Sequence, residues 1–425
     1  MSRVSDKTFR ALAEEPANAE AAAELNGLQL RHRVALLKGV VEEADAADHP
    51  DAGPASAAYT ALLELEAAAP AAVGRVLHHP AVSAWAWRTF LSLRARGPER
   101  PSRLGAVTLA AAIASGGACR VHVPLDDQGR LMVPSLGRLS LGTASAEIEL
   151  EAEGRRLRAH GRRIDVDLGA DGPGWQVLHR IRVGDGFEIV LDDLDPYRWP
   201  EPGRATPRID PAGLPAWRDL LPQAWTVLRE THPAVAEEIV AMVRAITPIA
   251  APPEGVSSAS ARETFGAIAM SVPRGSATWL AETLAHEIQH AKLDALMHFV
   301  PLVRYERTDS YYAPWRPDPR PAHGLLQGAY AYLGVSEFWQ RRHPREGLRG
   351  RVELARWREG VRRVLDTLED EQLLNDAGMN FVEGMRTRLG DVLAEPLDDE
   401  ALAAAERAAA DHKAAWQARN GRSDR

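Results

Sequence analysis

Cysteine and long apolar runs are scarce in this chain. Cys119 is the only cysteine in 425 residues, which excludes an internal disulfide and any cysteine-rich metal site. A nearly cysteine-free chain fits a reducing compartment. No apolar run approaches the roughly 20 residues of a membrane helix, and the first residues contain no signal-peptide core. We therefore expect a soluble, cytoplasmic protein that does not bind a membrane.

Lysine is also rare, and arginine supplies nearly all of the positive charge. The four lysines are scattered, the net charge is −8, and no basic block stands out. Nucleic-acid surfaces are normally built from clustered lysine and arginine, so we expect no nucleic-acid partner. The length is sufficient for two or three domains with real cores.

Three regions differ in their residue patterns. Residues 1–116 are rich in Ala, Leu and Glu at helical spacing, which predicts a helical N-terminal region. Residues 120–198 carry β-forming residues between Gly- and Asp-rich turns, which predicts a β-rich module. A Pro-rich stretch at 199–215 is typical of a linker, and residues 216–425 are again mainly helical, with Pro222 expected at a helix start.

The motif HExxH lies at residues 286–290, inside a predicted helix over residues 277–299. His286 and His290 are one turn apart, so their side chains lie about 40° apart around the axis and about 6 Å apart along it. Both imidazoles can therefore reach one metal ion. Glu287 projects beside that ion, where a zinc peptidase uses it as the general base. The predicted fold is α+β and mainly helical, with a metallopeptidase-like HExxH catalytic domain over residues 216–425.

The surroundings of the motif leave two interpretations open at several points. The flanking helix is apolar, which favours a metal site over a hydrogen-bonded structural His pair. A strand is predicted at residues 265–272 ahead of the helix. In metallopeptidase-like cores such a strand pairs with an extended peptide, but it could equally pack under the helix for stability alone.

The third metal ligand is not fixed by spacing. A metzincin-type histidine would fall at position 296, which is Leu. The predicted helix over residues 322–340 carries a polar stripe that indicates a site-lining face. That stripe offers His323 or Gln327 as the third ligand, with Glu337 as a gluzincin-like choice, and Glu306 is possible in the preceding segment.

Two other clusters contain ligand-type side chains. His78 and His79 precede Pro80, which is typical of a helix end. Asp192, Asp193 and Asp195 could bind a cation, but a turn that ends a strand is the favoured interpretation.

Taken together, the chain resembles the HExxH-motif proteins that modify ribosomally made peptides. The likeness rests on residues 265–266, 284–293 (LAHEIQHAKL), 313–324 (APWRPDPRPAHG) and 326–339 (LQGAYAYLGVSEFW). The resemblance implies an Fe(II)- and 2-oxoglutarate-dependent dioxygenase that β-hydroxylates side chains of a precursor peptide. It also implies that His286 and His290 bind the iron. Many members carry His where this chain has Gln327.

An enzyme that uses 2-oxoglutarate must hold its distal carboxylate, and a guanidinium does this with two parallel hydrogen bonds. Arg316 and Arg320 are the candidates, with a turn-stabilising role as the alternative for each. Two other hypotheses remain open for the whole protein. One is a zinc metallopeptidase, and the other is a peptide-binding protein whose catalytic site has decayed.

Overall fold

The computed structural model describes residues 3–143, 145–159, 162–184, 186–252, 256–272 and 275–421. Helices account for 57% of the chain and strands for 15%, so the predicted mainly helical α+β class is confirmed. In this described part, no helix is long and apolar enough to cross a membrane.

The chain divides into two compact units. The first unit comprises residues 1–28, 220–242 and 275–425, and the second comprises residues 29–219 and 243–274. The region predicted at 1–116 is helical and that at 120–198 is rich in strands, whereas 216–425 is mainly helical with short strands between residues 245 and 321. The compact units cut across these regions, because each unit is assembled from several segments. Helices α2 (Ala19–Ala46) and α7 (Leu214–Thr231) contribute residues to both units.

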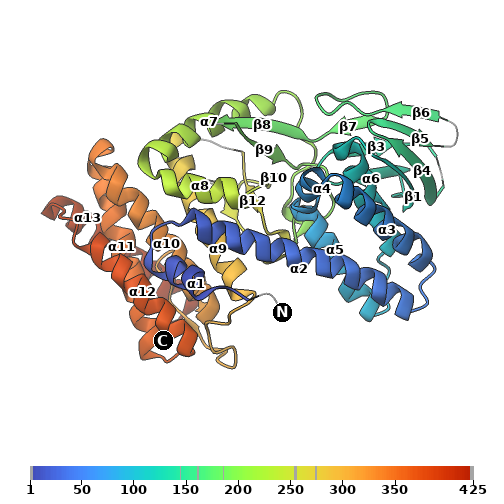
Figure 1. Ribbon diagram of the computed structural model, residues 1–425. Coiled ribbons are helices and arrows are strands. Elements are labelled where there is room, and N and C mark those ends of the chain that lie inside the picture. The colour runs from blue at the N-terminus through green and yellow to red at the C-terminus, as the bar shows by residue number, and fades with distance from the viewer. Residues whose placement is uncertain are drawn as a thin grey trace. The chain divides into compact units, whose positions relative to one another are not determined.

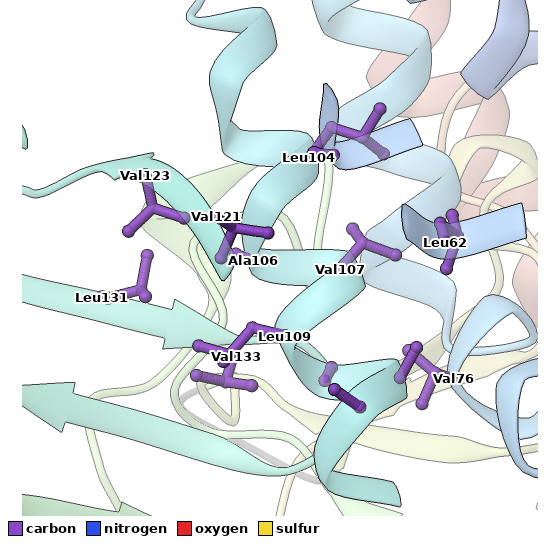
Figure 2. Packing of buried hydrophobic residues seen from close by; sticks show 14 of the residues in the cluster. Leu62, Val76, Leu104, Ala106, Val107, Leu109, Val121, Val123, Leu131 and Val133 are labelled. Carbon is purple, nitrogen blue, oxygen red and sulfur yellow. The ribbon is translucent and has the colours of Figure 1, made fainter. Parts of the chain in front are cut away.

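The second unit has a helical part followed by a strand-rich part. Its helices are α3 (Ala52–Ala68), α4 (Pro70–Leu77), α5 (Pro80–Arg94) and α6 (Leu104–Ser115), with short 3-10 turns at Pro101–Arg103, Pro202–Arg204 and Arg262–Thr264. Helix α6 is buried from Leu104 to Ile113, because it is apolar on every side. Figure 2 shows Leu104, Val107 and Leu109 of α6 between helix residues Leu62 and Val76 and the strand residues Val121, Val123, Leu131 and Val133.

In the described part of the second unit, twelve strands form three sheets. An antiparallel sheet has the order β1 (Ala118–Pro124), β4 (Glu147–Glu153), β5 (Arg156–Ala159) and β6 (Arg162–Asp165). A smaller one has the order β2 (Arg130–Val133), β3 (Gly137–Ser140) and β7 (Trp175–Val177). The mixed sheet has the order β11 (Ser258–Ala259), β12 (Ala267–Met270), β10 (Ala245–Pro248), β9 (Phe187–Leu191) and β8 (His179–Gly184).

Two expectations for this region need correction. Strand β12 pairs in parallel with β10, and Ala269 and Met270 also pair with β11. These residues have no free edge for a peptide, so the peptide-pairing interpretation of this strand is wrong there. The Pro-rich segment 199–215 is not a free linker either, because Trp199 is buried against Ile249 and Thr206 donates to the carbonyl of Pro248.

The first unit is a helical assembly (Figure 1). Its described residues also include two short strands that pair with each other in antiparallel. Its elements are α1 (Asp6–Glu14), α8 (Pro233–Met242), α9 (Ala277–Met297), β13 (Ser310–Tyr311), β14 (Arg320–Pro321), α10 (Ala322–Arg342), a 3-10 turn (His343–Arg345), α11 (Gly347–Asp370), α12 (Asp376–Leu393) and α13 (Asp399–Asn420). Pro222 lies inside α7 rather than at its start, because that helix begins earlier than predicted, at Leu214.

Buried ion pairs fix the helices that carry the motif. Lys292 of α9 donates to both carboxylate oxygens of Glu238 on α8, at 2.8 and 2.9 Å. Arg388 of α12 makes a two-pronged pair with Glu337 of α10, at 2.9 Å for each bond. All four side chains are at most 2% exposed. Removing one partner of such a pair leaves an uncompensated buried charge, so these pairs restrict how α8, α9, α10 and α12 can shift.

Candidate metal centre

Helix α9 is buried on every side except along one strip. From Leu280 to Met297, only Glu282, His286, His290 and Asp294 are partly exposed. These four recur every fourth residue, so they lie along one line on the helix surface. We call them the α9 strip. Sequence analysis identified the two histidines, and the same helical spacing could have identified Glu282 and Asp294.

The two histidines of the strip face each other. Their Nε2 atoms are 3.1 Å apart and their ring centroids 4.7 Å apart. Two imidazole nitrogens bound to one ion at about 2.1 Å lie about 3.0–3.4 Å apart for angles between about 90° and 109°. The observed separation therefore suits a shared metal ion without movement of either ring. Burial, together with His290, lowers the pKa of His286 well below its ordinary range, which favours the neutral ligand form.

Gln327 of α10 fixes the tautomer of His290. Its amide nitrogen donates to the carboxylate of Asp294 at 2.7 Å, so its Oε1 faces His290 Nδ1 at 3.0 Å. An amide oxygen only accepts, and therefore His290 carries its proton on Nδ1. The lone pair is then on Nε2, the atom that faces His286. Gln327 was predicted as a possible metal ligand; in this structure its amide group lies between His290 and Asp294 and orients the His290 ring.

Aromatic side chains line the other side of His286. The Tyr332 ring meets the His286 ring edge-on at 5.0 Å, and Trp315 and Trp357 pack on Tyr332 at 4.7 and 4.3 Å. Trp315 belongs to the Pro-rich loop 313–321, and it approaches α10 closely because residue 328 is Gly: a Cβ there would lie 2.3 Å from the indole nitrogen. Burial, with the Glu282 charge, raises the pKa of Tyr332, so the phenol keeps its proton. Tyr332 was not predicted as a site residue.

The polar residues of α10 that were predicted to line a site have a different role in the structure. Tyr330 is fully buried and its hydroxyl donates to the carbonyl of Leu12. Glu337 is held by Arg388, so its assignment as a gluzincin-like ligand is wrong. Gln327 and Tyr332 of α10 contact the two histidines of the strip instead, and no simple polar periodicity links them.

The structure does not assemble a third protein ligand around the two histidines. Across the described residues, His286 and His290 are not part of any group of three His, Cys, Asp or Glu ligand atoms within 4.8 Å of one another. His323 is exposed at the start of α10, one turn before Gln327, and Glu306 is exposed in the preceding loop. His323 as the third ligand stays a prediction.

Two acids accompany the histidines on α9. Glu287 is 1% exposed and follows His286 directly, where a general base of the HExxH type would lie. Glu282 precedes His286 by one turn. Burial raises the pKa of Glu282 to about 7, and the charge of Glu353 acts in the same direction. A carboxyl group with that pKa can hold or release a proton near neutral pH.

The two predicted carboxylate-binding arginines share one partner. Arg316 and Arg320 both pair with Asp318, at 3.1 and 3.0 Å, within the same loop. This arrangement stabilises the turn, which was the alternative interpretation for each residue. The three residues together still carry one excess positive charge, beside the Trp315 that packs on Tyr332. A 2-oxoglutarate site at these arginines stays a prediction.

A cavity of about 490 Å³ lies elsewhere in the first unit. It is lined by residues of α11 and α13 and by the start of the Pro-rich loop, including Arg356, Arg358, Arg363 and Lys413. None of the α9 strip residues lines it. The cavity therefore does not contain the candidate metal centre.

A second cluster of ligand-type side chains lies in the second unit. His79, Asp192 and Asp195 each place one ligand atom within 4.8 Å of the other two, and all three are at most 2% exposed. We call them the buried triad. Burial lowers the pKa of His79 to about 4 and raises that of Asp192 to about 6. The favoured sequence interpretations, a helix end and a strand-ending turn, describe the backbone there correctly but miss that these side chains meet.

Comparisons with known proteins add no family to this picture. No family model matches the chain, and no curated protein is significantly similar to it.

Proposed function

We propose that this protein is an Fe(II)- and 2-oxoglutarate-dependent dioxygenase that β-hydroxylates side chains of a ribosomally made precursor peptide. The single observation that carries the proposal is the pair of Nε2 atoms 3.1 Å apart on the α9 strip. The choice of iron and 2-oxoglutarate rests on the sequence resemblance. When bound, these two groups supply the oxidising chemistry that adds one oxygen atom to a side chain.

The residues around the pair have separate tasks in this proposal. His286 and His290 would hold the metal, since imidazole nitrogen suits iron as well as zinc. Gln327 and Asp294 keep the lone pair of His290 on Nε2. Such outer partners typically contribute a factor of about 10–100 to metal affinity.

Tyr332 and Trp315 form an aromatic wall beside His286 that limits access of water. Because α9 is exposed only along its strip between Leu280 and Met297, the peptide side chain must approach the two histidines from that side. Glu282 is on the same strip and can position water or exchange a proton there. Arg316 and Arg320 are the proposed contacts for the distal carboxylate of 2-oxoglutarate.

The proposal is tested with purified protein, Fe(II), 2-oxoglutarate, oxygen and a precursor peptide encoded beside the gene. We expect succinate and a peptide heavier by one oxygen atom, in equal amounts. A His286→Ala variant provides the inactive control, and His298→Ala, at the residue directly after α9 and beyond the strip, provides the active one. Absence of succinate and of modified peptide with an iron-loaded protein would contradict the proposal.

A zinc metallopeptidase is the second candidate, and one observation favours it. Glu287 is buried next to His286, where a peptidase uses such a carboxylate as general base. In that case the zinc form should cleave a peptide, and Glu287→Gln should abolish cleavage while zinc stays bound. The oxygenase proposal instead expects Glu287→Gln to retain hydroxylation. A protein that binds neither metal at the α9 strip would be a peptide-binding protein.

A further inference from the structure

The buried triad joins two parts of the second unit that are far apart in sequence. His79 is the residue immediately before α5, and Asp192 and Asp195 follow directly after β9. Strand β9 lies between β10 and β8 in the mixed sheet. The triad therefore lies where a helix begins and a sheet strand ends.

The loop after β9 aims one oxygen of each carboxylate into the triad. Asp192 Oδ1 accepts from the backbone N–H groups of Leu194 and Asp195, at 3.3 and 3.0 Å. Its Oδ2 is left facing His79 Nε2 at 3.5 Å. Asp195 Oδ1 accepts from the N–H of Tyr197 at 2.9 Å, and its Oδ2 is buried without a hydrogen-bond partner.

His79 has unsatisfied atoms in the same place. Both of its ring nitrogens are buried and have no hydrogen-bond partner among the described residues. The contact with Asp192 Oδ2 has ion-pair distance but not hydrogen-bond geometry. Buried polar atoms in folded proteins nearly always have a hydrogen-bond partner. The unpartnered atoms of His79 and Asp195 therefore point to a ligand that binds between them.

The charges of Arg103 and Arg198 act on Asp195 and Asp192, respectively, and lower their pKa values, but neither arginine forms an ion pair with these carboxylates. Arg198 donates to the carbonyls of Asp195 and Thr206, and Arg208 pairs with Asp193 instead. Within the described part of the chain, no lysine or arginine nitrogen lies within 4.0 Å of the carboxylate of Asp192 or Asp195. Two buried carboxylates without a direct ion pair to lysine or arginine are costly, and a divalent ion offsets both charges at once.

We propose that His79, Asp192 and Asp195 bind a divalent transition-metal ion, such as Zn²⁺ or Mn²⁺, that stabilises the second unit. One imidazole and two carboxylates are a donor set that these ions accept. The site is closed to solvent, so the ion has a structural role and does not turn over substrate. This proposal is independent of the function proposed for the α9 strip.

The test uses the full chain with the α9 histidines removed. The His286→Ala/His290→Ala protein is expressed in medium supplemented with zinc or manganese, and bound metal is measured by mass spectrometry after gel filtration. We expect about one ion per chain. Stripping that ion with a chelator should lower the melting temperature by about 5–10 °C, the shift for an ion present well above its dissociation constant.

Two further substitutions in the same background locate the ion. Asp195→Asn should lose the ion and its chelator-sensitive melting shift. Asp193→Asn is the matched control, because Asp193 lies in the same loop but pairs with Arg208, and it should keep the ion. If Asp195→Asn does not fold, His79→Gln replaces it. A folded His286→Ala/His290→Ala protein that carries no metal, or an Asp195→Asn protein that keeps it, would overturn the proposal.

Discussion

The α9 strip and the buried triad hold similar side chains in opposite surroundings. The strip offers two facing imidazoles on a helix line that solvent reaches, with Gln327 and Asp294 behind one of them. The triad offers one imidazole and two carboxylates that solvent does not reach. An open position and an ordered outer partner are what a catalytic metal site needs, whereas closure suits a structural site. In our two proposals, it is therefore exposure rather than ligand type that separates the catalytic site from the structural one.

The strongest way to separate the two regions is to remove the open pair. His286→Ala with His290→Ala should lower metal-dependent activity at least about 1,000-fold, because no ligand nitrogen remains on the strip. The melting temperature should change little, since these side chains are partly exposed. Activity assays and calorimetry on the same sample check this. A large fall in melting temperature with activity retained would reverse the assigned roles.

The second expected difference between the α9 strip and the buried triad is the rate at which each releases its metal ion. The buried triad can lose an ion only after local opening of the second unit, whereas the strip is already accessible. With excess chelator, we expect release from the triad to be about 100-fold slower or more. Stopped-flow absorbance with a chromogenic chelator measures both phases, and loss of the slow phase in Asp195→Asn assigns it. A single fast phase in the wild-type protein would contradict the comparison.

The outer partner of His290 is the next target. Gln327→Leu leaves the Nδ1 proton of His290 and the Asp294 carboxylate without the amide, so metal affinity at the strip should fall about 10–100-fold. Competition titration with a chelating dye measures the change. His323→Ala, one turn earlier on the same helix, should stay within about 2-fold if His323 is not a ligand. A greater loss from His323→Ala than from Gln327→Leu would identify His323 as the third ligand instead.

The smallest effect that we expect is that of Glu282→Gln on the pH dependence of stability. Its pKa is about 7 in the folded protein and near 4.5 when unfolded. At pH values between these two pKa values, the Glu282 carboxyl is protonated in the folded state and ionised in the unfolded state. The free energy of unfolding therefore falls as the pH rises from about 4.5 to about 7. In metal-free protein, Glu282→Gln should remove that loss, for a gain on the order of 2 kcal/mol at pH 8 and none at pH 4. Urea unfolding at both pH values checks this, and equal effects at the two would contradict it.

The sequence predicted those parts of the structure that depend on local spacing. The helix that carries His286 and His290 was expected at residues 277–299 and is found at Ala277–Met297. Strands were expected between residues 120 and 198, and β1–β9 lie there or within two residues. Both follow from periodicities of 3.6 and 2 residues, which are visible in one segment at a time.

Contacts between distant segments were not predictable in the same way. His79 and Asp192 are more than a hundred residues apart, and nothing in either segment indicates the other. On α10, the polar residues Tyr330 and Glu337 resemble a site-lining stripe but are buried against Leu12 and Arg388. A polar residue can face either a site or a buried partner, and only the packing of the helices decides which.

The most direct test of the central claim is an anaerobic optical titration of the Fe(II)-loaded protein with 2-oxoglutarate. A weak visible charge-transfer band that saturates at one equivalent, and that His286→Ala abolishes, is the predicted result. It would mean that 2-oxoglutarate binds directly to iron held by the α9 strip. No band, together with tight stoichiometric zinc at the same histidines, would contradict the oxygenase account and favour the peptidase.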